Sequence, residues 1–317
     1  TPGRAQDLIN QGKLDFSAVE ITAIDEADQM ADMGFLPQVR KLLSATPKGG
    51  QRLLFSATLD GDVDKLVRQF MHNPVTHSTA PVQAAVDSME HYQLLVGSRE
   101  ARNEIVPYIA AREGKTVMFM RTKHGVDRQV KKLRRVGINA HPLHGDKGQG
   151  ARTRAIEGFA DGSIPVLVAT DIAARGIDIS DVSLVVHIDP PAEHKAYLHR
   201  AGRTARAGTS GTVVTLVMDD QRKEVDHLLR KAGVDATKVQ VTAGDAKLAK
   251  ITGARKPTGS PLPPPGQQAQ AGKPSSTKHR SARGNNRRRG GNQRNHSGAR
   301  RQKRSSGRNN SGRNRSS

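Results

Sequence analysis

The chain has 317 residues, of which 51 are Lys or Arg and 30 are Asp or Glu, so its formal net charge is +21. It has no cysteine, which excludes disulfide bonds and cysteine-bound zinc. It also has no run of about 18 apolar residues, the length that a membrane-spanning helix needs. The first residues, Thr1 to Arg4, show neither an initiator Met nor a signal-peptide pattern, which favours a soluble, intracellular part of a longer protein.

Short apolar runs, rich in Val, Ile and Leu, alternate with helical patterns through residue 235. Continuous rather than alternating apolar character predicts strands buried on both faces of parallel sheets, and hence an α/β fold. Between two of these runs, Val126, Val130 and Leu133 predict a helix that Gly137 ends. The predicted strands are Val19–Ile24, Arg52–Phe55, Thr116–Met120, Val166–Ala169, Leu184–Ile188 and Thr212–Met218.

The pattern predicts four segments along the chain. Residues 1–75 form the distal part of one α/β domain, residues 76–88 are a linker containing Pro81, and residues 89–235 form a second domain. Residues 236–317 are predicted to be a disordered tail, because Gly, Asn, Ser and Arg come to dominate and apolar residues are few.

The tail carries most of the net charge. Residues 250–317 contain 18 Lys or Arg and no Asp or Glu, whereas residues 1–249 are nearly balanced. Such a segment favours contact with a phosphate backbone without reading its sequence. The alternative is a tail that only promotes solubility.

Two polar clusters follow the first two predicted strands. The acidic residues of Asp25–Asp28 come directly after one strand, and Ser56–Thr58 follow the next. At the carboxyl end of a parallel sheet, carboxylates can hold Mg²⁺ and orient an attacking water, and hydroxyls can bridge to carboxylates. The alternatives are a solvated acidic loop and an ordinary N-cap for a helix starting near Asp60.

Two further clusters lie in the second domain. A polar loop, Thr170–Asp178, follows a predicted strand, and an aspartate there can accept hydrogen bonds from ribose hydroxyls. The segment His199–Gly208 contains three Arg and a His. Arg203 and Arg206 are three residues apart, so on a helical turn they would share a face and could bind the phosphates of a nucleoside triphosphate. The alternative is a solvated basic helix face, which is also how we interpret Lys131, Lys132, Arg134 and Arg135.

The order of these clusters resembles the DEAD-box family of RNA helicases. The sequences TPGR (Thr1–Arg4), DEAD (Asp25–Asp28), SAT (Ser56–Thr58), VATDIAARGIDI (Val168–Ile179) and HRAGRTAR (His199–Arg206) carry the resemblance. Gln149 and Arg152 match the family's Gln-x-x-Arg element. Phe119–Lys123 lie where the first motif of the family's second domain is expected. The resemblance covers about residues 1–235 and implies two RecA-like domains, the first one truncated at its N-terminus.

The resemblance also implies roles for individual residues. Asp25 and Glu26 would handle Mg²⁺ and the attacking water, Asp178 would contact the ATP ribose, and Arg203 and Arg206 would be arginine fingers. The residues expected to couple the two domains are Asp28, Ser56, Thr58 and His199. Those expected to face the RNA backbone are Thr1, Gly3, Arg4, Gln149, Arg152 and Thr170.

Two departures from the family pattern concern glycine and the phosphate loop. Ala205 stands where the family usually has Gly. The Gly-Lys-Thr at Gly114–Thr116 precedes a strand instead of following one, so it is not a phosphate-binding loop. We therefore expect that loop upstream of Thr1, and we expect the 317-residue chain alone to lack ATPase activity.

The expected function of the whole protein is that of a cytoplasmic, ATP- and Mg²⁺-dependent RNA helicase. Its RNA partner would be single-stranded or a short duplex, bound through its backbone, with no membrane partner. Ribosomal or RNA-degradation partners are left open. The alternatives are a DNA helicase or translocase of the same superfamily and a non-enzymatic RNA-annealing protein that works through the basic tail.

Overall fold

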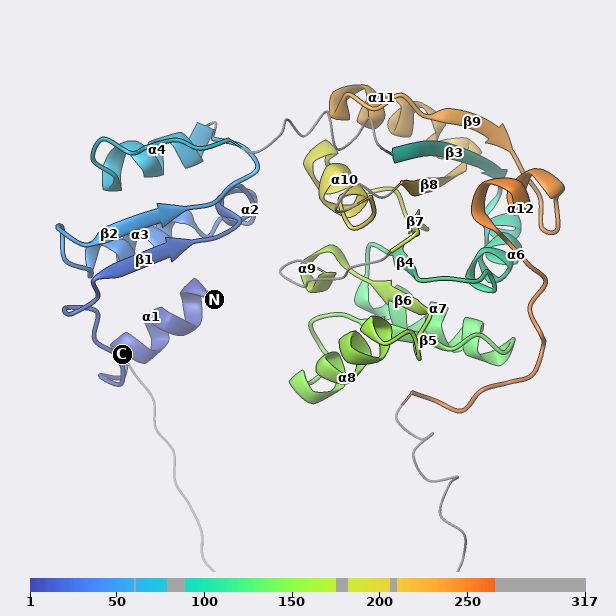
Figure 1. Cartoon of the computed structure of the whole chain (residues 1–317), viewed down its shortest axis with the longest axis horizontal. Coiled ribbons are helices and arrows are strands. Elements are labelled where there is room, and N and C mark those ends of the chain that lie inside the picture. Colours follow the sequence, from blue (N-terminus) through green and yellow to red (C-terminus); the bar gives the residue numbers. More distant parts are fainter. Residues whose placement is uncertain (60, 79–88, 175–181, 206–209, 266–317) are drawn as a thin grey trace, which may run out of the picture. The chain divides into compact units, whose positions relative to one another are not determined.

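The computed structural model of the chain describes residues 1–59, 61–78, 89–174, 182–205 and 210–265. Residues Thr1–Gln270 group into one compact unit. Two parallel sheets organise its described part, one of two strands and one of seven (Figure 1). The α/β fold class predicted from the sequence is confirmed.

The first sheet lies within residues 1–70. Its strands β1 (Ile21–Ile24) and β2 (Gln51–Leu54) pair in parallel, with Ile24 opposite Leu54. Leu36, Val39, Leu43, Leu66 and Phe70 form its small helical core, with Ile24 and Leu54 packed against it. The accompanying helices are α1 (Pro2–Asn10), α2 (Ala27–Asp32), α3 (Leu36–Ser44) and α4 (Gly61–Phe70).

Burial of this sheet differs from the prediction. Alternate residues of β1 and β2 face the helical core, while the others are exposed, with Ile21 at 59% and Leu53 at 38%. Phe55, just after β2, is 56% exposed. The expectation that both faces of these strands are buried is therefore wrong for the described residues, because the helical core covers only one face.

The second sheet has the strand order β5-β6-β4-β7-β8-β3-β9, and every pairing is parallel. The strands β4, β6 and β7 are buried along their whole length. The strands are β3 (Met89–Gly97), β4 (Thr116–Phe119), β5 (Ala140–Leu143), β6 (Val166–Ala169), β7 (Leu184–His187), β8 (Gly211–Met218) and β9 (Thr237–Gln240).

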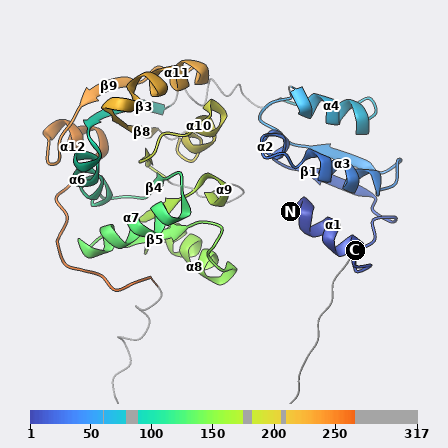
Figure 2. The same cartoon turned by 180° about the vertical axis from the view of Figure 1, so that it is seen from behind.

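Helices cover both faces of the second sheet (Figures 1 and 2). One apolar core joins the sheet to α8 (Gln149–Ala160), α9 (Asp171–Ala174), α10 (His194–Ala201) and α11 (Arg222–Ala232). The other joins it to α6 (Arg99–Ala110), α7 (Lys123–Arg135) and α12 (Ala246–Thr252). None of the helices in the described ranges has the length and apolar character that crossing a membrane requires.

The second sheet extends beyond the predicted boundary at residue 235. Strand β9 pairs with β3, and Leu248 of α12 is fully buried in the core. The prediction that the disordered tail begins at residue 236 is therefore wrong for residues 237–252. The signal was weak because β9 is an edge strand with the sequence Thr-Lys-Val-Gln. Residues 266–317, and residues 79–88 of the predicted linker, lie outside the described residues.

Candidate nucleotide and nucleic-acid site

The acidic cluster lies where β1 ends and α2 begins, as the sequence predicts. The Asp25 carboxylate accepts a hydrogen bond of 2.9 Å from the backbone N–H of Glu26. Glu26 is the N-cap of α2 and has left-handed backbone angles, φ 52° and ψ 48°. This conformation costs a non-glycine residue about 1 kcal/mol or more. The backbone there is fixed by the next residue, since the N–H of Ala27 donates to the carbonyl of Phe55 at 3.1 Å.

Ser56 connects the second strand to the acidic cluster. Its Oγ accepts a hydrogen bond of 3.1 Å from the backbone N–H of Asp28 and donates one of 2.6 Å to the carbonyl of Thr58. The hydroxyl therefore bridges two loops at the carboxyl edge of the sheet, which was the functional interpretation of this cluster. The alternative, a helix N-cap, is not what Ser56 does.

A cavity of about 200 Å³ brings predicted residues from both sheets together. Within it, His199 Nε2 lies 3.8 Å from Asp28 Oδ2. Asp28 is only 2% exposed, and this oxygen has no hydrogen-bond partner in the described part of the chain. Near it, Lys195 Nζ donates to Thr58 Oγ1 at 3.4 Å, a contact that sequence reasoning missed. The cavity is lined by Asp25, Glu26, Asp28, Ser56, Ala57, His199 and Arg203.

Helix α10, which precedes Arg203, is fixed by a buried arginine. Arg200 is 2% exposed, and its Nε and Nη2 donate to the two carboxylate oxygens of Asp171, the Nη2 bond being 2.9 Å. Its Nη1 donates to the carbonyl of Asp189 at 2.9 Å, and the guanidinium lies over the ring of Phe119. Sequence reasoning missed the role of Asp171, although an acid directly after a strand end was the available signal.

A buried polar cluster seats the same helix on the sheet. The hydroxyl of Tyr197 lies 2.9 Å from His91 Nδ1, and its ring contacts His187 edge-on at 4.8 Å. Burial, followed by the charge of Arg200, keeps the pKa of His187 well below its ordinary value. The ring of His187 is therefore neutral at physiological pH, where it supports α10 from the sheet side.

The predicted arginine pair is only partly described. Helix α10 ends at Ala201, so Arg203 follows the helix, and Ala205 has a left-handed φ of 54°. Arg206, like Asp178, lies outside the described residues, so the pairing of Arg203 with Arg206 stays a prediction.

The predicted RNA-facing residues lie at helix N-termini away from the cavity. Thr1 is the N-cap of α1, and Gly3 and Arg4 lie in its first turn. Arg4 forms an ion pair with Asp7. Gln149 and Arg152 lie in the first turn of α8, and Thr170 accepts the first hydrogen bonds of α9 through its carbonyl. Exposed N–H groups at helix N-termini suit phosphate, and the assignment of these residues to RNA stays a prediction.

Two carboxylates of the cavity, those of Asp25 and Glu26, are the candidate ligands for a metal ion. The described residues contain no group of three or more His, Asp or Glu side chains that could hold a metal ion by themselves. Asp25 and Glu26 line one cavity, and Mg²⁺ is commonly held by one or two carboxylates together with water and phosphate oxygens. The donor set therefore fits a magnesium–nucleotide site that phosphate and water complete.

Parallel sheets with an acidic strand end and a basic helix end at one cavity are typical of the RecA-like α/β class. Two family models match the chain, "DEAD/DEAH box helicase" over residues 1–66 and "Helicase conserved C-terminal domain" over residues 100–208. Together they span more than half of the chain. The chain belongs to the DEAD-box RNA helicase family.

Individual relatives agree with this assignment. The ATP-dependent RNA helicase RhlB of Pseudomonas syringae pv. tomato is 37% identical over 74% of this chain and 59% of its own length. The ATP-dependent RNA helicase DBP2 of Debaryomyces hansenii is 37% identical over 70% of this chain and 42% of its own length. The structure of S. cerevisiae Dbp5 bound to RNA and ADP BeF3 superimposes with a TM-score of 0.70 at 28% identity, covering 80% of this chain and 68% of that chain. The chain thus spans about half the length of these curated relatives.

Proposed function

We propose that the protein containing this chain is an ATP-dependent RNA helicase, which couples ATP hydrolysis to local separation of RNA strands. The observation that carries this proposal is the cavity in which Asp25 and Glu26 lie with His199 and Arg203. Carboxylates and a guanidinium at one cavity are the groups that phosphoryl transfer needs, because the reaction depends on positioning and on neutralising charge. The names of the relatives support the same activity.

Each residue of the cavity has a distinct proposed role. Glu26 orients the attacking water and accepts its proton. Arg203 stabilises the negative charge that develops on the transferred phosphoryl group, and Arg206 has the same proposed role. Asp28, Ser56, Thr58 and His199 pass the state of the nucleotide from one sheet to the other through the contacts between them. Asp178 is proposed to contact the ribose.

The proposed cofactors are ATP and Mg²⁺. Asp25 and Glu26 would hold the metal through water, and bound Mg²⁺ would supply positive charge at the phosphates. The buried Asp28, whose Oδ2 lies 3.8 Å from His199 Nε2, adds a third carboxylate to the same cavity. The proposed cytoplasmic location rests on the family resemblance alone.

The proposed RNA contacts use backbone groups and basic side chains. Gln149, Arg152 and Thr170 on the second sheet's domain, and Thr1, Gly3 and Arg4 on the first, would bind phosphates. The structure of Dbp5 bound to RNA and ADP BeF3 supports an RNA strand and a nucleotide on one molecule. RNA and DNA oligonucleotides of equal sequence distinguish this proposal from a DNA helicase, since only an RNA enzyme depends on the 2′-hydroxyl.

The test is a pair of substitutions in the full-length protein. Glu26→Gln keeps the shape of the side chain but removes the base, so ATP turnover should fall by about 10²-fold or more while ATP and RNA still bind. Arg203→Ala should lower turnover by about 10³-fold, and Arg203→Lys should restore little, because an ammonium lacks the planar fork. The exposed Glu20, outside the cavity, provides the matched control Glu20→Gln.

Three outcomes would count against the proposal. Turnover near the wild-type rate in Glu26→Gln would show that the acidic cluster is not catalytic. Loss of RNA affinity with normal turnover at saturating RNA in Arg203→Ala would make Arg203 an RNA contact instead. Strand annealing that persists in both variants without ATP would favour the non-enzymatic alternative.

A further inference from the structure

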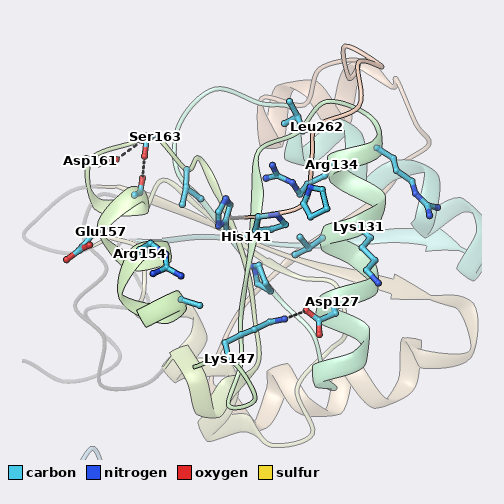
Figure 3. A pocket seen from close by; sticks show the side chains of 18 residues that line it. Asp127, Lys131, Arg134, His141, Lys147, Arg154, Glu157, Asp161, Ser163 and Leu262 are labelled. Carbon is cyan, nitrogen blue, oxygen red and sulfur yellow. Dashed lines mark hydrogen bonds and ion pairs between the residues drawn. The ribbon is translucent and has the colours of Figure 1, made fainter. Parts of the chain in front are cut away.

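A large pocket lies between α7 and α8, separate from the cavity described above. It has a volume of about 1010 Å³ and is walled by α7, α8, the edge strand β5 and the segment Leu262–Pro265 (Figure 3). None of the residues to which the family resemblance assigns a role lines it. Its basic side chains include Lys131 and Arg134 of α7 and Arg154 of α8.

Arg134 is a buried cation that has no acidic partner among the described residues. It is 3% exposed, although the sequence suggested a solvated helix face. Its Nε donates to the carbonyl of Pro263 at 2.6 Å and its Nη1 donates to Asn139 Oδ1 at 2.7 Å, while Nη2 has no partner among the described residues. The other two buried arginines of the described chain, Arg102 and Arg200, each pair with a carboxylate. Because an uncompensated buried charge is costly, the wall at Arg134 favours an anion nearby.

Two exposed cations face the same pocket from opposite walls. Lys131 and Arg154 form no ion pair with any described residue. Two acids of the pocket are engaged elsewhere and do not neutralise these cations. Asp127 pairs with Lys147 at 2.7 Å, and Asp161 accepts a hydrogen bond from the backbone N–H of Ser163. Glu157 points away from the pocket in Figure 3. The unpaired charge that remains inside the pocket is therefore positive.

The pKa of His141 in β5 is lowered in part by the positive charge of Arg134. Burial, and then the charge of Arg134, lowers the pKa of His141 to about 4. The ring is therefore neutral at physiological pH and can donate a hydrogen bond to an oxyanion without adding charge. Figure 3 shows it beside Arg134 at the centre of the pocket.

An added β-strand does not suit this site. Pro142 of edge strand β5 has no N–H to offer, and the carbonyl of Ala140 already accepts a hydrogen bond from Arg134 at 3.3 Å. The chain's own tail does not suit it either. Residues 266–317 begin directly after Pro265 at the rim and contain 15 Lys or Arg and no acid, so the pocket repels them. Pocket and tail instead attract the same polyanion.

We propose that this pocket is a second phosphate-binding site, which holds the backbone of an RNA segment outside the helicase site. Lys131 and Arg154 contact phosphates directly, and Arg134 contributes its charge from the wall. The inference rests on the proposed function, because it takes RNA as the ligand.

The test measures binding of a fluorescein-labelled oligouridylate to the 317-residue chain without nucleotide, over a series of salt concentrations. The variant Lys131→Glu/Arg154→Glu is compared with Arg128→Glu/Lys132→Glu, which makes the same charge change on α7 outside the pocket. Losing two phosphate contacts should lower the log–log salt slope by about 1.4, since each contact to a single strand contributes about 0.7. The matched control should keep most of the wild-type slope. Circular dichroism checks the folding of each variant, and Lys131→Gln/Arg154→Gln is the milder replacement should charge reversal unfold the domain.

Two results would overturn the inference. One is an equal loss of slope in both double variants, which would mean that only net charge matters. The other is an unchanged RNA slope together with tripolyphosphate binding that the pocket variant abolishes, which would make the ligand a free polyphosphate. Both outcomes leave the ATPase results for Glu26→Gln untouched, so failure of this inference is distinguishable from failure of the proposed function.

Discussion

The pair of Arg200 and Asp171 provides the sharpest stability prediction. The Arg200 side chain is 3% exposed and Asp171 is 32% exposed, and two hydrogen bonds join them. Arg200→Ala removes both bonds, the bond to the Asp189 carbonyl and the contact with Phe119. Breaking a buried pair of this kind costs about 3–5 kcal/mol. The two charge-assisted bonds alone, at about 1.5 kcal/mol each, give an expected coupling of about 3 kcal/mol.

The assay is a double-mutant cycle with Arg200→Ala, Asp171→Ala and the double variant, each unfolded in urea. The chain has no Trp, and its three tyrosines, Tyr92, Tyr108 and Tyr197, all lie in the part built on the second sheet. Tyrosine fluorescence therefore follows unfolding of that part alone. Arg222 and Asp219 form an exposed pair at 2.6 Å in the same part and serve as the control, with an expected coupling below about 1 kcal/mol.

A coupling energy for Arg200 and Asp171 no larger than that of the control would refute this reasoning. It would mean that the cost of burying the guanidinium cancels the two bonds, so the pair would not be what fixes α10. Arg200→Lys separates charge from geometry, because a lysine keeps the charge but cannot bond both carboxylate oxygens. It should recover less than half of the loss.

Two further predictions concern backbone strain and pH. Ala205→Gly should raise the free energy of unfolding by about 0.5–1 kcal/mol, because glycine adopts the left-handed φ of 54° without strain. Ala201→Gly inside α10 should lower the free energy of unfolding by about 1 kcal/mol, because glycine is a poor helix former. Urea unfolding of both variants measures the two effects. The pKa of His141 is about 4 in the folded protein and about 6.5 in the unfolded chain. The contribution of neutral His141 to the free energy of unfolding should therefore be fully present above pH 6.5 and be lost as the pH falls toward 4. Unfolding of His141→Gln across this range should show a shallower fall, with the remainder assigned to His187, whose pKa is also lowered; an unchanged profile would contradict the role of His141.

The sequence predicted the central strands well because their pattern has one physical cause. Val166–Ala169 is a strand with the predicted bounds, and the predicted strands that became β4 and β7 each end one residue earlier than expected. All three are buried on both faces, so their positions are mainly apolar, with Thr116 and His187 as buried polar exceptions. Helix α7 and the glycine after it also follow the prediction, since Gly137 has a φ of 90° that favours glycine.

The strands that sequence reasoning missed contain polar residues with tertiary partners. In β3, His91 lies beside Tyr197 and Gln93 bonds to Asp226, so polar side chains are buried where the pattern suggested none. Strand β5 contains His141 and Pro142 at a sheet edge, which breaks an apolar run. These pairings join residues far apart in the chain, and no local pattern encodes them.

The candidate site shows the same division. The order of motifs located the acidic cluster, Ser56 and Arg203, because each belongs to a short polar motif that follows a strand or a helix. It did not reveal the left-handed backbone of Glu26 or the contact of Lys195 with Thr58, since both depend on elements that meet only in the folded chain. Sequence composition also does not reveal that Arg200 is paired with a carboxylate whereas Arg134 has no acidic partner among the described residues.

That difference between arginines links stability to function. Buried Arg200 is paired with the half-buried carboxylate of Asp171 and so holds α10, the helix that leads to Arg203, in one position. Arg134 is equally buried but has no acidic partner among the described residues, and Lys131 and Arg154 of the same pocket form no ion pair with them either. A protein that only needed stability would gain by replacing Arg134 with an apolar residue of similar size, because burying an unpaired cation is unfavourable. A buried charge that the fold does not neutralise is therefore best explained by a ligand that does, and the salt dependence of RNA binding is the measurement that decides it.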